Sequence, residues 1–387
     1  MRTGLLFILL AVLGLVSWTA WHFWMILPRA WKWPFTVVYL FSFLLVFANF
    51  VWRNTLPLGL ATAAYELGNS WMIFFLYAVI LFALLGIGRL VHLVPGGFLK
   101  DSVAGSATVL GIIAGLLVYG GFHYHHKYRE EIVLTTEKAL EKPLTIVLAS
   151  DLHVGYHNRK AELARWVDLI NAEHPDLVLF AGDILDGAIR PATEWKYDEE
   201  FRRISAPVYA SLGNHEYITG IDSSEAFYAK AGIRLLKDAQ ATVCGITLIG
   251  RDDRSNPSRR ALFEYEKADS SFTILLDHQP FHLEEAEEDG IDFQFSGHTH
   301  HGQVWPLNWV TDAMYEKAFG PHQRGNTRYY ISSGLGIWGG RFRIGTRSEY
   351  VVLHLKKHIT WSRSAHLPED GPCTLQAFRL CAGKVLR

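Results

Sequence analysis

The sequence contains little cysteine and almost no net charge. Its 387 residues include three cysteines, Cys244, Cys373 and Cys381, which are too few and too scattered for a disulfide framework or a structural zinc site. The formal net charge is −1, so the chain lacks the basic field that is typical of nucleic-acid-binding proteins, and we expect no nucleic-acid partner. The length is sufficient for two domains with a sizeable core.

Charged residues are missing from four long stretches in the first third of the chain. These stretches lie between Arg2 and Arg29, between Lys32 and Arg53, between Glu66 and Arg89, and between Asp101 and Lys127. Each reaches the roughly 20 apolar residues that cross a bilayer as a helix. We therefore predict an integral membrane protein with an all-α membrane domain over 1–125, the lipid bilayer as a partner, and transmembrane helices at about 4–26, 35–52, 70–92 and 103–121.

The predicted spans favour an anchor over a transport path. Only His22 lies well inside a span, and the sequence has no inverted repeat of broken helices. The first span is too long for the apolar region of a signal peptide and is followed by three more. Basic residues near the span ends are balanced between the two sides, so they do not decide the orientation. Lys138 and the sparse cysteines favour a cytoplasmic catalytic domain.

From residue 143 onward, short apolar strands alternate with helical segments, which is typical of an α/β domain. Five of these strands are followed by side chains that bind metals or serve in catalysis, in the order Asp151 and His153, Asp183, Asn214 with His215 and Glu216, His278, and His298 with His300. Each side chain alone has an ordinary alternative, such as a helix cap or a turn. Because the carboxyl ends of parallel strands meet at one edge of a sheet, the set indicates a shared site for divalent metals.

These motifs resemble those of the calcineurin-like metallophosphoesterases over about residues 143–356. The bacterial membrane-anchored branch is the most similar, with Ser150-Asp151-Leu152-His153 as its first motif. This chain departs from that branch at His301, where the branch has Gly, and at Ser333, where an Arg is common. The resemblance implies a four-layer αββα sandwich at 143–358 and a place in a bacterial inner membrane. The segment at 359–387 lacks clear periodicity and is predicted to be a peripheral tail.

The resemblance also implies two divalent metal ions. Asp151, His153, Asp183 and His300 would hold the first ion, and Asp183 would bridge to the second, which Asn214, His278 and His298 complete. His215 would act as a general acid towards the leaving oxygen, and Glu216 is a candidate for orienting the ligands. A mixed nitrogen and oxygen ligand set suits Mn²⁺, Fe, Zn²⁺ or Ni²⁺ and does not choose among them.

The expected function is hydrolysis of a phosphodiester or a pyrophosphate by a hydroxide that bridges the two metals. The predicted spans and the aromatic segments at 305–310 and 337–343 make a lipid-linked phosphate ester an attractive substrate. The alternative is a non-catalytic, metal-dependent membrane binding or assembly protein. His215 disfavours that alternative, because a scaffold needs no general acid. The substrate, its binding residues and the oligomeric state stay open.

Overall fold

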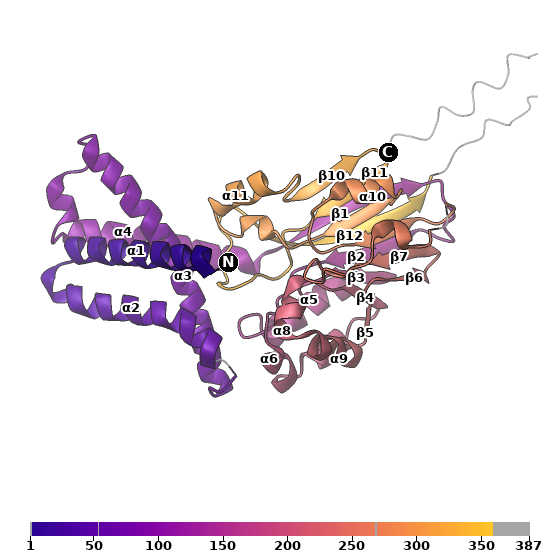
Figure 1. Ribbon diagram of the computed structural model, residues 1–387, viewed down its shortest axis with the longest axis horizontal. Coiled ribbons are helices and arrows are strands. Elements are labelled where there is room, and N and C mark those ends of the chain that lie inside the picture. Colours follow the sequence, from indigo (N-terminus) through magenta and orange to yellow (C-terminus); the bar gives the residue numbers. More distant parts are fainter. Residues whose placement is uncertain (1, 53, 268, 359–387) are drawn as a thin grey trace, which may run out of the picture. The chain divides into compact units, whose positions relative to one another are not determined.

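The computed structural model describes residues 2–52, 54–267 and 269–358. Residues 1–357 form one unit, in which four long helices precede a domain with two β-sheets (Figure 1). The predicted tail at 359–387 lies outside the described residues.

The charge-poor stretches fold as four long helices, α1 (Arg2–Ile26), α2 (Arg29–Trp52), α3 (Leu58–Leu90) and α4 (Val103–His125). All four are long and apolar enough to cross a membrane. Helix α3 follows Pro57 and begins well before the expected span at 70–92. A stretch without charged residues marks only the part of a helix that suits lipid. Helix α3 is longer than that stretch because it includes Glu66, whose carboxylate pairs with Arg159 and Arg341.

The four helices share one apolar core. Phe23 of α1, Tyr39 of α2, Trp71 of α3 and Ile113 of α4 are all buried in it. Val304 and Ile344 of the two-sheet domain belong to the same cluster. The apolar core of the helices therefore continues onto the surface of the two-sheet domain.

The first sheet has six strands in the order β1 (Lys127–Thr136), β12 (Ser348–Lys357), β2 (Leu144–Ala149), β3 (Leu177–Ala181), β4 (Val208–Ser211) and β5 (Ile233–Leu235). Strands β2 to β5 run parallel to one another, and β12 is antiparallel to β2. Strand β1 pairs along the full length of β12 and precedes the expected domain start at 143.

The second sheet also has six strands, in the order β10 (Gly320–Arg324), β11 (Thr327–Ile331), β9 (Phe293–Ser296), β8 (Thr273–Leu276), β7 (Ile246–Gly250) and β6 (Ala239–Val243). Its four central strands are parallel, and both edge strands are antiparallel to their neighbours.

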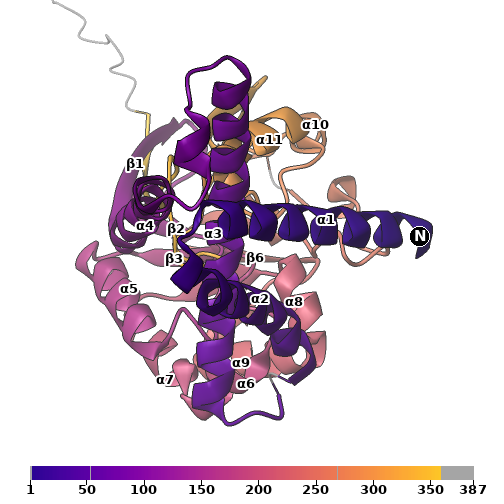
Figure 2. The same ribbon diagram turned by 90° about the vertical axis from the view of Figure 1, so that its left-hand side faces the viewer.

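The two sheets pack face to face between helices. In β2, Ile146 and Leu148 point into the core between the sheets, whereas Val147 and Ala149 point to the outer face, as the two-residue period of a strand requires. The outer face is covered by α5 (Lys160–Ala172), α7 (Tyr197–Phe201) and α9 (Ile221–Ala231). Helix α10 (Leu283–Glu288) covers the second sheet on the other side (Figure 2). The predicted αββα fold is confirmed.

Candidate metal centre

The loops after five parallel strands converge at one edge of the double sheet. The loop after β2 carries Asp151 and His153, the loop after β3 carries Asp183, and α8 (Asn214–Thr219) begins directly after β4. The loop after β8 carries His278, and the loop after β9 carries His298, with His300 opening a 3₁₀ turn, η3 (His300–Gly302). The topology thus explains how residues from 151 to 300 meet at one place.

The structure brings these side chains into compact groups. Asp151, His153 and His300 form one group of candidate metal ligands, and Asp183, His278 and His298 form another. His153 Nε2 lies 3.1 Å from His300 Nε2, and His278 Nε2 lies 3.2 Å from an oxygen of Asp183. Two donor atoms that each lie about 2.1 Å from one ion are separated by roughly 3.0–3.5 Å. At least one pair of donor atoms in each group is therefore spaced as two ligands of one ion are.

Asp183 stands between the two groups. One of its carboxylate oxygens lies 3.2 Å from His278 Nε2 and 3.6 Å from His153 Nε2. Its other oxygen accepts a hydrogen bond from the backbone N–H of His215. The same carboxylate therefore faces both ligand groups and is fixed in orientation by the loop that carries His215.

Unpaired polar atoms at the site fit metal ligation. Asn214 Oδ1 and His300 Nδ1 are buried and have no hydrogen-bond partner among the described residues. An unpaired buried polar atom costs about 1–3 kcal/mol. A cation would satisfy Asn214 Oδ1, which belongs to the expected second ligand set. The donor types and the unpaired atoms together fit a divalent metal.

Five candidate ligands adopt a backbone conformation that is rare for residues other than glycine. Asp151, His153, Asp183, His298 and His300 have φ angles of 54°, 45°, 53°, 71° and 48°. This left-handed region is unfavourable for residues other than glycine and costs of order 1–3 kcal/mol per residue, so it is found mainly at functional sites. We infer that the fold holds these five side chains in position at a cost to its stability.

Two glycines allow the ligand loops to approach one another. A Cβ atom on Gly213 would collide with Asp183, and a Cβ atom on Gly297 would collide with Asp151 and Ser150. The absence of a side chain at both positions is therefore a steric requirement of the site rather than a need for loop flexibility.

The buried carboxylates and imidazoles shift one another's protonation. Burial raises the pKa of Asp183, but the charge of His278 outweighs it, so the pKa lies well below its ordinary value. Burial lowers the pKa of His153, but its interactions with Asp151 and Asp186 raise it to about 10. The carboxylates thus stay ionised, as cation binding requires, and a metal ion must displace the proton of His153.

Glu216 lies behind the ligands and holds their loops. Its carboxylate accepts hydrogen bonds from the backbone N–H groups of Asp183, Leu185 and Gly213, at 3.0, 3.0 and 2.8 Å. Burial and the negative charge of Asp183 raise its pKa to about 7. The contacts are those of a residue that positions the ligand loops, which is the role expected for it.

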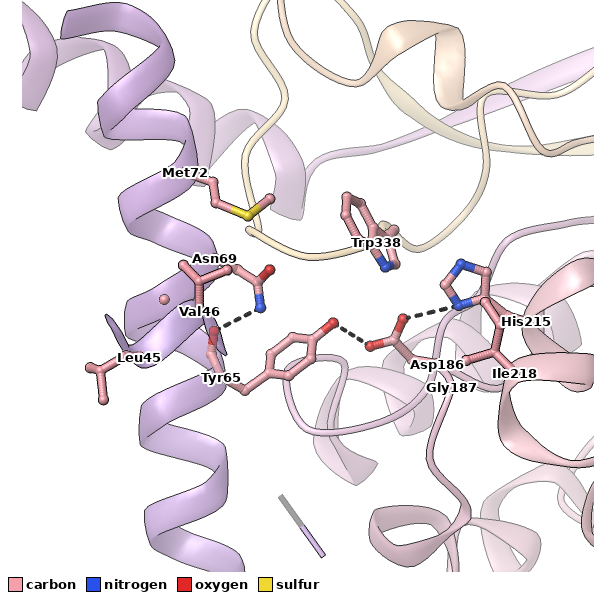
Figure 3. Close-up of a pocket in the computed structure, with 11 residues that line it drawn as sticks. Leu45, Val46, Tyr65, Asn69, Met72, Asp186, Gly187, His215, Ile218 and Trp338 are labelled. Carbon is pink, nitrogen blue, oxygen red and sulfur yellow. Dashed lines mark hydrogen bonds and ion pairs between the residues drawn. The ribbon is translucent and has the colours of Figure 1, made fainter. Parts of the chain in front are cut away.

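Asp186, which is not among the residues predicted from the sequence, is buried beside the candidate ligands. One oxygen lies 3.1 Å from His153 Nδ1 and 3.7 Å from His215 Nδ1. The other oxygen accepts a hydrogen bond of 2.5 Å from the hydroxyl of Tyr65, in α3 (Figure 3). The sequence signal for Asp186 is that it is a second carboxylate, three residues after Asp183. Asp186 orients His153 so that its Nε2 atom faces the other ligands.

His215 lies next to the ligand groups. Its ring centre is 4.5 Å from that of His153 and 6.5 Å from that of Trp338. Burial lowers the pKa of His215 more than the neighbouring carboxylates Asp183 and Asp186 raise it. The ring therefore lies within reach of a group bound at the centre.

Arg343 is a buried cation that contacts the loop carrying Ser333. The guanidinium of Arg343 is fully buried and donates hydrogen bonds to the backbone carbonyls of His300, Ser333 and Gly336. Burial lowers its pKa to about 10. Arg343 therefore holds the loops that carry His300 and Ser333 together.

Comparison with known proteins agrees with the fold and the motifs. Residues 144–302 match the model of the calcineurin-like phosphoesterase family. An uncharacterized metallophosphoesterase of Helicobacter pylori is 32% identical over 227 residues, which are 56% of this chain and 60% of that protein. A transmembrane protein with metallophosphoesterase domain from Danio rerio is 31% identical over 277 residues, which are 65% of this chain and 63% of that protein.

Residues 144–302 of this chain therefore form a calcineurin-like phosphoesterase domain. The aligned parts cover 60% and 63% of these two relatives, so the chain matches less than two thirds of the length of either protein.

Proposed function

We propose that this protein is a membrane-anchored phosphoesterase that uses two divalent metal ions to hydrolyse a phosphodiester or a pyrophosphate. The proposal rests on one observation, the position of Asp183 within 3.6 Å of both His153 and His278, the histidines of two separate ligand groups. A carboxylate in such a position can bridge two cations about 3.5–4 Å apart.

We assign Asp151, His153, Asp183 and His300 to the first ion, and Asp183, Asn214, His278 and His298 to the second. The bound ions would lower the pKa of an attacking water and neutralise the oxygens of the phosphoryl group. The ligand types are compatible with Mn²⁺, Fe, Zn²⁺ or Ni²⁺.

The protein's own contribution to bond cleavage is assigned to His215. Its ring atom Nδ1 lies 3.7 Å from Asp186, and its backbone N–H donates to Asp183. This position supports a role as the general acid that protonates the leaving oxygen. An anionic phosphoryl group next to the ring favours the protonated imidazole, because opposite charges stabilise one another in a buried site.

The four apolar helices support anchoring in a membrane, with residues 1–125 as the membrane domain and 143–358 as the catalytic domain. A lipid-linked phosphate ester is the substrate class that this arrangement favours. We retain the cytoplasmic orientation as the working hypothesis for the catalytic domain.

The first test is hydrolysis of bis(p-nitrophenyl) phosphate by the full-length protein in detergent micelles, after chelation and after addition of Mn²⁺, Fe²⁺, Zn²⁺ or Ni²⁺. We expect turnover that depends on metal and is abolished in Asp183→Ala, which should also lose bound metal. If two ions bind per chain and no metal supports turnover of any phosphate ester, the non-catalytic binding or assembly role is favoured instead.

A further inference from the structure

A cavity of about 180 Å³ opens beside His215, between the helices α2 and α3 and the loops of the metal centre. Leu45 and Val46 of α2 and Met72 of α3 line one side (Figure 3). His215, Ile218 and Trp338 line the other side, and Asp186 lies at the same end as His215. The cavity thus joins the proposed general acid to two helices that are apolar enough to cross a membrane.

The polar groups of the cavity are mostly engaged with one another. The Tyr65 hydroxyl donates to Asp186, and the Asn69 side-chain amide donates to the backbone carbonyl of Tyr65. The lining side chains of Leu45, Val46, Met72, Ile218 and Trp338 are apolar or aromatic. A polar leaving group, such as a sugar or a nucleoside, would lose hydrogen bonds with water and regain few of them here.

Because the general acid faces the leaving oxygen, the group that leaves must lie on the same side of the phosphorus as His215. We propose that this cavity binds the apolar alcohol that leaves from a membrane phosphodiester, and that the substrate is therefore a phospholipid from which the lipid alcohol is released. This inference rests on the proposed function. Water would add its oxygen to phosphorus, the bond between phosphorus and the lipid oxygen would break, and His215 would give its proton to that oxygen.

The products distinguish this orientation from the reverse one. Cleavage on the lipid side of a phosphodiester yields a diacylglycerol and the phosphate monoester of the head group, whereas cleavage on the other side yields a phosphatidic acid and the free head-group alcohol. A released diacylglycerol would leave the cavity beside helices α2 and α3, which are apolar enough to cross a membrane.

The experiment uses the full-length, Mn²⁺-loaded protein in nanodiscs that contain phosphatidylglycerol, phosphatidylethanolamine or phosphatidylinositol, in ¹⁸O-labelled water. We expect diacylglycerol without label and a head-group phosphate that carries one ¹⁸O. Phosphatidic acid as the product would overturn the proposal. Turnover of bis(p-nitrophenyl) phosphate without turnover of any lipid would also overturn it and leave the proposed function intact, whereas no turnover of either would overturn both.

A pair of variants tests the cavity itself. Met72→Trp fills the cavity, and Leu84→Trp adds the same side chain to α3 at a position outside the cavity that is 57% exposed. We expect Met72→Trp to lower the ratio of lipid to bis(p-nitrophenyl) phosphate kcat/KM at least tenfold and Leu84→Trp to leave it unchanged. An equal ratio in the two variants would show that the cavity does not hold the lipid.

Discussion

Removal of the Tyr65 hydroxyl tests whether helix α3 is part of the metal centre. The hydroxyl lies 2.5 Å from one oxygen of Asp186, and the other oxygen lies 3.1 Å from His153 Nδ1. Tyr65→Phe deletes that hydrogen bond and leaves the ring, which stacks on His157, in place. We expect Asp186, and with it His153, to be held less firmly in the orientation that faces the ligands.

The size of the effect follows from the hydrogen bond. A bond to a charged group contributes about 1.5–3 kcal/mol, and each 1.4 kcal/mol corresponds to roughly a factor of ten. Asp186 keeps its contacts with His153 and His157 in the variant. We therefore take the lower end and predict Mn²⁺ affinity and kcat each reduced about tenfold, with KM for a small phosphodiester changed less than twofold.

Tyr77→Phe is the matched control. Tyr77 is also in α3 and also donates one hydrogen bond across to the two-sheet domain, at 2.8 Å to the backbone carbonyl of Trp305. It has no contact with the candidate ligands in the part of the chain that the structure describes. Both variants should lower the melting temperature, but only Tyr65→Phe should weaken metal binding. Equal metal affinity and equal kcat in the two variants would refute the reasoning.

Three further predictions concern the centre and the fold. His215→Ala should keep both ions, and its kcat with alkyl esters should fall by a factor of roughly 10²–10⁴. With p-nitrophenyl esters the fall in kcat should be smaller, because their leaving group departs without a proton. An equal fall with both kinds of ester would count against a general acid. Glu216→Gln should cost about 1–3 kcal/mol in chemical unfolding, because one backbone N–H of the ligand loops loses its acceptor; an unchanged midpoint would contradict this. Burial raises the pKa of Asp176, but a hydrogen bond from Lys142 and one from a backbone N–H outweigh it, so the pKa is lowered. The ionised carboxylate therefore stabilises the fold above the unfolded pKa of about 3.9, and this contribution is lost as pH falls. Asp176→Ala should lower the melting temperature more at pH 7 than at pH 3.

The candidate ligands could be selected from the sequence because each follows a strand that short-range patterns reveal. The apolar run of β3 predicts a buried strand, and Asp183 comes two residues after its end. Parallel strands then bring their following loops together, whatever the sequence distance between them. The grouping of residues as distant as Asp151 and His300 therefore required only local signals and one rule of topology.

Contacts between α3 and the domain could not be predicted in this way. Tyr65 and Asp186 are 121 residues apart, and nothing near Tyr65 distinguishes it from the other aromatic residues of an apolar helix. The early start of α3 was hidden for a related reason. The charge-free stretch that begins after Glu66 shows only which residues suit lipid. Glu66 itself is stabilised in the helix by two arginines that lie 93 and 275 residues away in sequence, so the sequence near it does not reveal that the helix includes it.

These contacts make α3 a structural part of the candidate metal centre. Tyr65 contacts Asp186, and its neighbour Glu66 pairs with Arg159 and Arg341, so one turn of α3 contacts three different loops of the two-sheet domain. A fragment that begins at residue 143 would leave the Asp186 oxygen without its donor and both arginines without their carboxylate. It would also lack β1, which pairs along all of β12. Low activity in such a fragment would therefore report the loss of these supports and would say little about the chemistry of the complete chain.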